Sequence, residues 1–145
     1  MFPFLMSLVF AAFGATTPHQ PDDSVSLARR LVFSTSLANF ITSTEVSERD
    51  PRLDWTSDGC SAPLVGGTGR SFDFTNACRR HDFGYRNFSR IDAGIWWDAP
   101  MRRRIDDKFL ADMRTSCSRR STRDRLICRG WALVFYRTVR AYAGP

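Results

Sequence analysis

The stretch ACRRHDFGYRN, residues 77–87, determines how the rest of the chain is interpreted. If it forms an α-helix, His81 lies beside the residues three and four positions away, which include Cys78 and Tyr85. Asp82 also lies next to these two residues, on the inner face opposite the arginines. His81 and Asp82 are separated by ~100° about the helix axis and are poor partners for each other. Each therefore needs a partner elsewhere in the fold.

A candidate partner for His81 occurs in the next predicted helix, which begins at Asp98 and Pro100 and stops near Cys117. Asp106 shares an apolar stripe with Phe109 and Met113, and we expect it to face inward, whereas Asp112 is expected to face outward. An inward carboxylate can fix the tautomer of a histidine and raise its basicity. A purely structural polar pair between two helices would produce the same pattern.

The partner of Asp82 is predicted to be a metal ion. Asp58 lies in the loop just before Cys60, and two carboxylates with backbone carbonyls are hard oxygen ligands of the kind that calcium prefers. Asp54 and Asp73 in the same loop are competing ligands. Asp58 could instead be an ordinary surface residue that caps a turn.

The four cysteines predict two disulfide bonds, because an even number in a short secreted chain forms a disulfide framework. They are Cys60, Cys78, Cys117 and Cys128. Three pairings are possible from the count alone. No CxxC pair is present, which disfavours a zinc site.

The N-terminal segment resembles a secretory signal. The apolar stretch from Phe2 to Phe13 is shorter than the ~20 residues that span a bilayer, and small residues follow it. We expect a signal peptide over residues 1–15, possibly to about 20, with cleavage near Gly14 or Ala15 and a mature domain over residues 22–145. No Lys or Arg precedes the stretch, and a buried core segment is the alternative.

The remaining pattern is helical, and the predicted fold class is all-α. A first helix is expected from about Ser24 to Glu45, followed by a loop over residues 47–71 that is rich in proline and glycine. A second helix is expected over residues 75–88. Ser121 and Asp124 resemble a capping box for the last helix. Its apolar stripe is predicted to comprise Ile127, Trp131, Val134, Phe135, Thr138 and Tyr142.

Several motifs in the same order resemble the secreted phospholipases A2 of bacteria and fungi. They are CRRHDFGYRN at residues 78–87, Asp-Gly-Cys at residues 58–60, and Arg-Ile-Asp at residues 104–106 followed by Phe109, Asp112, Met113 and Cys117. The resemblance extends from about Asp54 to the C-terminus. Two departures are present: Gly59, where bacterial members have a larger residue, and a longer loop over residues 61–74. The longer loop bears on substrate preference more than on activity.

The resemblance implies calcium-dependent hydrolysis of the sn-2 ester of glycerophospholipids. His81 would be the general base and Asp106 would orient it. Calcium would be held by the side chains of Asp58 and Asp82 and by the carbonyl of Gly59. No covalent nucleophile is needed, because His81 takes a proton from the attacking water.

The same resemblance implies the bridges Cys60–Cys78 and Cys117–Cys128. The expected architecture is a small helical domain with a calcium loop and two antiparallel, disulfide-stapled central helices. We expect the protein to be a secreted monomer that acts on phospholipid at a membrane or micelle surface and has no nucleic-acid partner.

The composition leaves other functions open. The formal net charge is +6, and Lys108 is the only lysine, so the positive charge is almost entirely arginine. Arginine-rich surfaces suit nucleic acids as well as membranes. Trp96 and Trp97 among arginines could contact lipid or pack in the core. A membrane-active or receptor-binding protein without catalysis is another alternative, but it would usually have lost the His-Asp pair or the calcium loop.

Overall fold

The computed structural model describes residues 23–60 and 72–142. This part of the chain is helical and contains no strand, which confirms the all-α prediction. The elements are α1 (Asp23–Arg29), the π-helical segment η1 (Arg30–Ser34), α2 (Leu37–Glu45), α3 (Thr75–Phe88), the 3-10 segment η2 (Ile91–Gly94), α4 (Ala99–Cys117) and α5 (Thr122–Tyr142). No described helix is apolar over a length that would cross a membrane.

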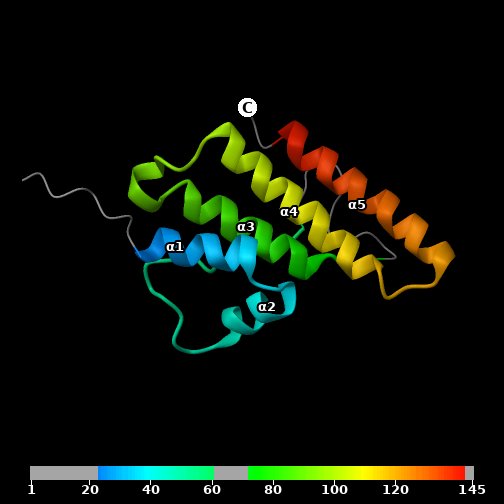
Figure 1. Ribbon diagram of the computed structural model, residues 1–145, viewed down its shortest axis with the longest axis horizontal. Coiled ribbons are helices and arrows are strands. Elements are labelled where there is room, and N and C mark those ends of the chain that lie inside the picture. The colour runs from blue at the N-terminus through cyan, green and yellow to red at the C-terminus, as the bar shows by residue number, and fades with distance from the viewer. Residues whose placement is uncertain (1–22, 61–71, 143–145) are drawn as a thin grey trace, which may run out of the picture.

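The central pair is formed by α3 and α4, which run antiparallel beside each other (Figure 1). The helix α5 packs along the other side of α4, and α1, η1 and α2 pack against α3 from the side away from α5. A methyl group built on Gly84 of α3 would lie 2.9 Å from Ile105 Cγ2 of α4. The absence of a side chain at Gly84 therefore lets the two central helices approach closely.

The sequence predicts the starts of α4 and α5 well because capping residues lie there. Asp98 accepts a hydrogen bond from the Met101 N–H at 2.7 Å and caps α4, with Pro100 in its first turn. Ser121 accepts from the Asp124 N–H at 3.3 Å and donates to the Asp124 carboxylate at 2.9 Å before α5. These contacts confirm both predicted starts.

The predicted single N-terminal helix is wrong. The chain becomes extended at Thr35, and Ser36 starts α2 by accepting a hydrogen bond from the Asn39 N–H at 3.2 Å. A buried guanidinium explains the break, since Arg80 Nη1 donates to the Thr35 carbonyl at 2.6 Å. That carbonyl is available because the helix is interrupted there.

The predicted apolar stripe of the last helix is also wrong, except for Phe135. Cys128, Ala132 and Phe135 are buried in α5, whereas Ile127, Trp131, Val134 and Tyr142 are exposed. The disulfide between Cys117 and Cys128 turns Cys128 toward α4, and residues at helical spacing from it follow inward. Ile127 and its row are consequently rotated toward the solvent.

Asp112 does not face outward as predicted. Its side chain is buried, and both its carboxylate oxygens pair with the guanidinium of Arg80, which is itself buried in α3. A buried carboxylate is tolerated when a partner of opposite charge satisfies it. This pair joins the two central helices.

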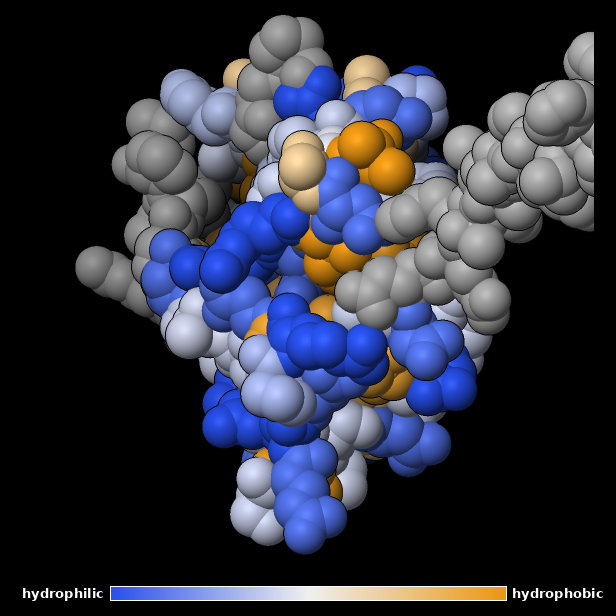
Figure 2. All heavy atoms as spheres, turned by 90° about the vertical axis from the view of Figure 1, so that its left-hand side faces the viewer, coloured by the Kyte–Doolittle hydropathy of each residue, from blue (hydrophilic) through white to orange (hydrophobic). Residues whose placement is uncertain are grey.

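One end of the molecule is mostly hydrophilic, with hydrophobic atoms exposed between the polar side chains (Figure 2). Figure 2 shows the end of the molecule with the start of α1 and the end of α3, where hydrophilic side chains surround a recess with exposed hydrophobic atoms. The predicted signal peptide and the glycine-rich residues 66–69 lie outside the described residues.

Candidate active site

His81 of α3 and Asp106 of α4 face each other across the central helix pair. His81 Nε2 lies 2.8 Å from Asp106 Oδ1, and the Asp106 side chain has no exposed surface. The two residues occupy the facing sides of antiparallel helices, as the apolar stripe around Asp106 predicts. Because Nε2 is occupied by Asp106, Nδ1 is the ring nitrogen that can take a proton from a substrate or water.

Two further side chains hold Asp106. The Tyr85 hydroxyl donates to Oδ1 at 2.8 Å, and Arg140 Nη1 donates to Oδ2 at 2.9 Å. Burial alone would raise the pKa of Asp106, but the hydrogen bonds from His81, Arg140 and Tyr85 outweigh it and lower that pKa. Asp106 is therefore a carboxylate, which favours a positive charge on the neighbouring imidazole.

Tyr85 and Arg140 are not among the site residues predicted from the sequence. Tyr85 lies four residues after His81, so helical spacing could have placed it beside the histidine. Burial, and then the hydrogen bond to Asp106, raises the pKa of Tyr85, which keeps its hydroxyl protonated as a donor. Arg140 comes 34 residues after Asp106 and belongs to another helix, so no local pattern connects them.

Aromatic rings line the histidine. The His81 ring centroid lies 4.4 Å from that of Tyr85 and 4.7 Å from that of Phe109. Trp97 packs against Tyr85 at 4.8 Å, and its neighbour Trp96 donates its indole N–H to Asp92 at 2.9 Å. Only 10% of the His81 side chain is exposed. The tryptophans are thus partly buried against the core, and this apolar wall limits water around the imidazole.

Asp82 lies on the adjacent side of α3, against the loop that precedes Cys60. Its Oδ2 accepts hydrogen bonds from the Ser57 hydroxyl at 2.6 Å and from the Asp58 N–H at 3.2 Å. Burial, with a smaller contribution from the nearby Asp58 charge, raises the pKa of Asp82 to about 6. The surroundings of Asp82 therefore stabilise its negative charge poorly, and a nearby cation would favour the ionised carboxylate.

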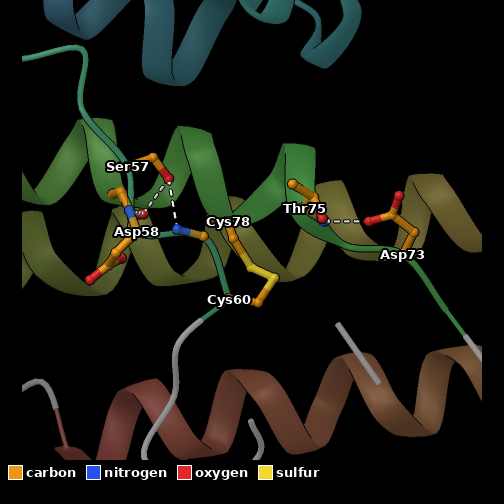
Figure 3. The surroundings of a disulfide bond; sticks show 8 residues. Ser57, Asp58, Cys60, Asp73, Thr75 and Cys78 are labelled. Atoms are coloured by element: carbon orange, nitrogen blue, oxygen red, sulfur yellow. Dashed lines mark hydrogen bonds between the residues drawn. A yellow bond between two sulfur atoms is a disulfide. The ribbon is translucent and has the colours of Figure 1, made fainter. Parts of the chain in front are cut away.

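The loop itself is fixed to α3. The Cys60–Cys78 disulfide ties its end to the helix one turn before Asp82, and Figure 3 shows Ser57 and Asp58 lying across that turn. Gly59 has a φ of +74°, a left-handed conformation that glycine adopts without strain. Glycine at this position therefore avoids the backbone strain that a larger residue would carry.

The donor set suits a calcium ion. Asp58 and Asp82 supply carboxylates and Gly59 a backbone carbonyl, all hard oxygens, and a cation would relieve the deficit of positive charge at Asp82. The Asp58 side chain is 66% exposed, and its Oδ2 forms a long ion pair with Arg86 Nη2 at 3.7 Å. Within residues 23–60 and 72–142, no group of three or more His, Cys, Asp or Glu side chains forms a metal cage. Carbonyl and water oxygens would have to complete the coordination.

The two competing ligand candidates are engaged elsewhere. Asp54 accepts hydrogen bonds from Thr56 and pairs with Arg90 at 2.6 Å. Asp73 accepts from the Thr75 N–H at 2.9 Å at the start of α3. The hydrogen bonds to Thr56 and Thr75 lower the pKa of the respective carboxyl groups. Neither residue shares a hydrogen bond with Asp82 in the described structure.

The second disulfide holds the last helix on the site. Cys117 at the end of α4 is joined to Cys128 of α5, so both bridges have the pairing that the resemblance implies. Further along α5, the Tyr136 hydroxyl donates to Asp107 at 2.7 Å. These contacts fix the helix that carries Arg140.

Comparison with known proteins gives concordant matches. The family model described as prokaryotic phospholipase A2 matches residues 28–143, which include every candidate site residue above. A secretory phospholipase A2 of Beauveria bassiana is 38% identical over 144 residues, which cover 99% of this chain and 70% of the relative. A secretory phospholipase A2 of Arthroderma benhamiae is 34% identical over 137 residues, covering 92% of this chain and 86% of the relative.

Proposed function

Since the chain belongs to the prokaryotic phospholipase A2 family and is a phospholipase A2, we propose that it hydrolyses the sn-2 ester of glycerophospholipids in a calcium-dependent reaction with His81 as the general base. The observation that supports this most is the 2.8 Å contact between His81 Nε2 and the fully buried Asp106. A lone carboxylate would be costly at that position, and this one is aimed at the imidazole.

The base acts through Nδ1. His81 takes a proton from a water molecule, and the water oxygen forms a bond to the carbonyl carbon of the ester. Asp106 stabilises the imidazolium that results, because it remains ionised and bonded to Nε2. General-base assistance of this kind typically accelerates a reaction by ~10²–10⁴-fold.

The second step returns the proton. As the bond between the carbonyl carbon and the sn-2 oxygen breaks, the imidazolium of His81 donates its Nδ1 proton to the leaving oxygen. The products are a fatty acid and a lysophospholipid, and His81 returns to its neutral form. The rings of Tyr85 and Phe109 keep the imidazole in one orientation throughout.

The side chains of Asp58 and Asp82 and the carbonyl of Gly59 would hold the calcium ion. When bound, calcium supplies positive charge for the phosphate and for the oxyanion of the transition state. Asp82 directly follows His81 in α3, and the disulfide between Cys60 and Cys78 holds the loop with Asp58 and Gly59 against the same helix. With two charged ligands, weak binding of ~10⁻⁴–10⁻³ M is expected, as in other extracellular sites.

The test is fatty-acid release from vesicles whose sn-1 and sn-2 chains differ, with calcium titrated and then chelated. His81→Gln should abolish turnover and leave calcium binding by calorimetry nearly unchanged, because His81 is not a ligand. Asp58→Asn and Asp82→Asn should each raise the calcium requirement, whereas the matched control Asp73→Asn should not. Full activity in excess chelator would rule out the calcium site, and release of the sn-1 chain would rule out the sn-2 assignment.

The proposed contact with a lipid surface is supported by α5. Leu126, Ile127, Trp131 and Val134 are between 40% and 67% exposed on one helix that is rich in arginine. A basic helix with an exposed apolar face suits an anionic lipid interface. Ile127→Ser with Trp131→Ser should lower hydrolysis of anionic vesicles but not of dissolved short-chain substrate. Equal loss on both substrates would argue against this surface.

Secretion is part of the proposal, because the relatives are named secretory and the N-terminal segment resembles a signal. We expect cleavage near Gly14 or Ala15, and the chain that remains contains the phospholipase A2 domain at residues 22–145. Mass spectrometry of exported, active protein checks this. An intact Met1 on that material would contradict it.

A further inference from the structure

Arg140 connects the last helix to the chemistry of the site. It lies in the final turns of α5, and its Nη1 atom donates to Asp106 Oδ2 at 2.9 Å. The Asp106 side chain has no exposed surface, while 37% of the Arg140 side chain is exposed. A partly exposed guanidinium therefore pairs with a carboxylate that has no solvent-accessible surface.

The two oxygens of Asp106 have different partners. Oδ1 accepts from both His81 and Tyr85, and Oδ2 accepts from Arg140. The terminal torsion of an aspartate side chain has a broad range of accessible angles. Hydrogen bonds to one carboxylate oxygen therefore do not fix the position of the other oxygen. Arg140 holds the second oxygen and thereby sets the plane in which Oδ1 meets the imidazole. Without it, Oδ2 would be buried with no hydrogen-bond donor, which is costly.

The rest of α5 is arranged so that Arg140 stays in place. The disulfide to Cys117 holds the start of the helix on α4, and Phe135 packs against Phe74 with ring centroids 5.6 Å apart. The Tyr136 hydroxyl bonds to Asp107, the residue that follows Asp106. The position of Arg140 is thus set by contacts of α5 with α4 and with the residue that precedes α3.

From this geometry we infer that Arg140 is a positioning residue of the esterase reaction, acting through Asp106 on His81. The inference rests on the proposed role of His81 as base. It adds a residue from a third helix to the reaction machinery, so that the C-terminal helix is required for turnover as well as for stability. Arg140 need not touch substrate to have this effect.

If Arg140 only stabilised the fold, its replacement would lower the amount of folded enzyme and not the kcat of the folded enzyme. Turnover of a dissolved short-chain phospholipid distinguishes this structural role from a positioning role. This substrate removes any effect of charge on binding to vesicles. Arg140→Gln should lower kcat about tenfold, because a hydrogen bond to a buried charge is lost but is partly screened by solvent. KM should change by less than about twofold, and Arg140→Lys should recover most of kcat. Arg137→Gln, an exposed arginine on the same helix, is the matched control and should match the parent enzyme.

The decisive arm repeats Arg140→Gln in an Asp106→Asn background. If Arg140 acts through the carboxylate, its replacement there should change kcat by less than about twofold. A tenfold loss that persists in that background, or a kcat for Arg140→Gln within about twofold of the parent, would overturn the inference. Thermal unfolding of every variant shows whether a loss reflects the folded enzyme, and Arg140→Lys provides a second, milder test.

The same series distinguishes this inference from the proposed function. If His81→Gln and Asp106→Asn both keep normal turnover, the base assignment is wrong and the role of Arg140 is lost with it. If both lose turnover and Arg140→Gln does not, the base assignment stands and only the role of Arg140 is refuted.

Discussion

Replacing Arg80 with methionine should destabilise the fold by ~3–5 kcal/mol, because it leaves a buried carboxylate without its main partner. Arg80 Nε donates to Asp112 Oδ2 at 2.8 Å, Nη2 pairs with Oδ1, and Nη1 donates to the Thr35 carbonyl at 2.6 Å. The side chains of Arg80 and Asp112 are only 2% and 5% exposed, respectively. Lys108 Nζ, 3.3 Å from Asp112 Oδ1, would remain as a weaker partner.

The magnitude follows from which groups lose partners. For a chain of this size, the loss corresponds to a fall in Tm of roughly 10–20 °C. Replacing both residues, as Arg80→Met with Asp112→Leu, removes the buried charge altogether and should recover most of the stability, since apolar pairs often replace buried ion pairs without penalty. A residual cost of ~1–3 kcal/mol is expected because the Thr35 carbonyl still lacks its donor.

The assay is thermal unfolding followed by circular dichroism at neutral pH with the disulfides intact. Arg79→Met, at the neighbouring half-buried arginine of α3, is the control and should shift stability by less than Arg80→Met, by about 1 kcal/mol or less. The reasoning is refuted if Arg80→Met unfolds at the same temperature as Arg79→Met. It also fails if the double replacement loses as much as the sum of Arg80→Met and Asp112→Leu.

Four further predictions concern the metal loop and the helix packing. Because the pKa of Asp82 is raised to about 6, ionisation of Asp82 without calcium should lower stability as pH rises through the range from about 4 to about 6. Below about pH 6, calcium affinity measured by calorimetry should fall ~tenfold per pH unit, and a constant affinity to pH 5 would contradict this. Replacing Cys117 and Cys128 by serine should cost ~2–4 kcal/mol in chemical denaturation, and no change in midpoint would count against the bridge. Gly84→Ala should cost ~1–3 kcal/mol, because its methyl group meets Ile105 Cγ2 at 2.9 Å, and unchanged stability would show that the helices can separate.

The helices themselves could be predicted from local chemistry. Asp98 and Pro100 predict the start of α4, and Ser121 with Asp124 predicts the start of α5. Such predictions are possible because capping contacts involve residues a few positions apart. The inward position of Asp106 also follows from helical spacing, since its neighbours along the stripe are apolar. Its pairing with His81 then required only that the two helices be adjacent.

The N-terminal break could not be predicted in the same way. Thr35 and Ser36 are compatible with a continuing helix, and an apolar pattern runs through them. The interruption depends on the Arg80 guanidinium, which reaches the Thr35 carbonyl from a helix 45 residues later. Such a contact exists only after the chain has folded.

What the sequence by itself determined is thus the positions of α3, α4 and α5, the all-α class and the inward-facing positions of His81 and Asp106, because each of these depends on spacing between near neighbours in the chain. The tertiary structure alone decided how each helix is rotated about its axis. The bridge to Cys128 turned the apolar row of α5 toward solvent, and the close approach of α3 and α4 buried Asp112. It also decided that Arg140 bonds to Asp106. Rotation and distant pairing are set by packing between elements, so a pattern within one element carries no record of them.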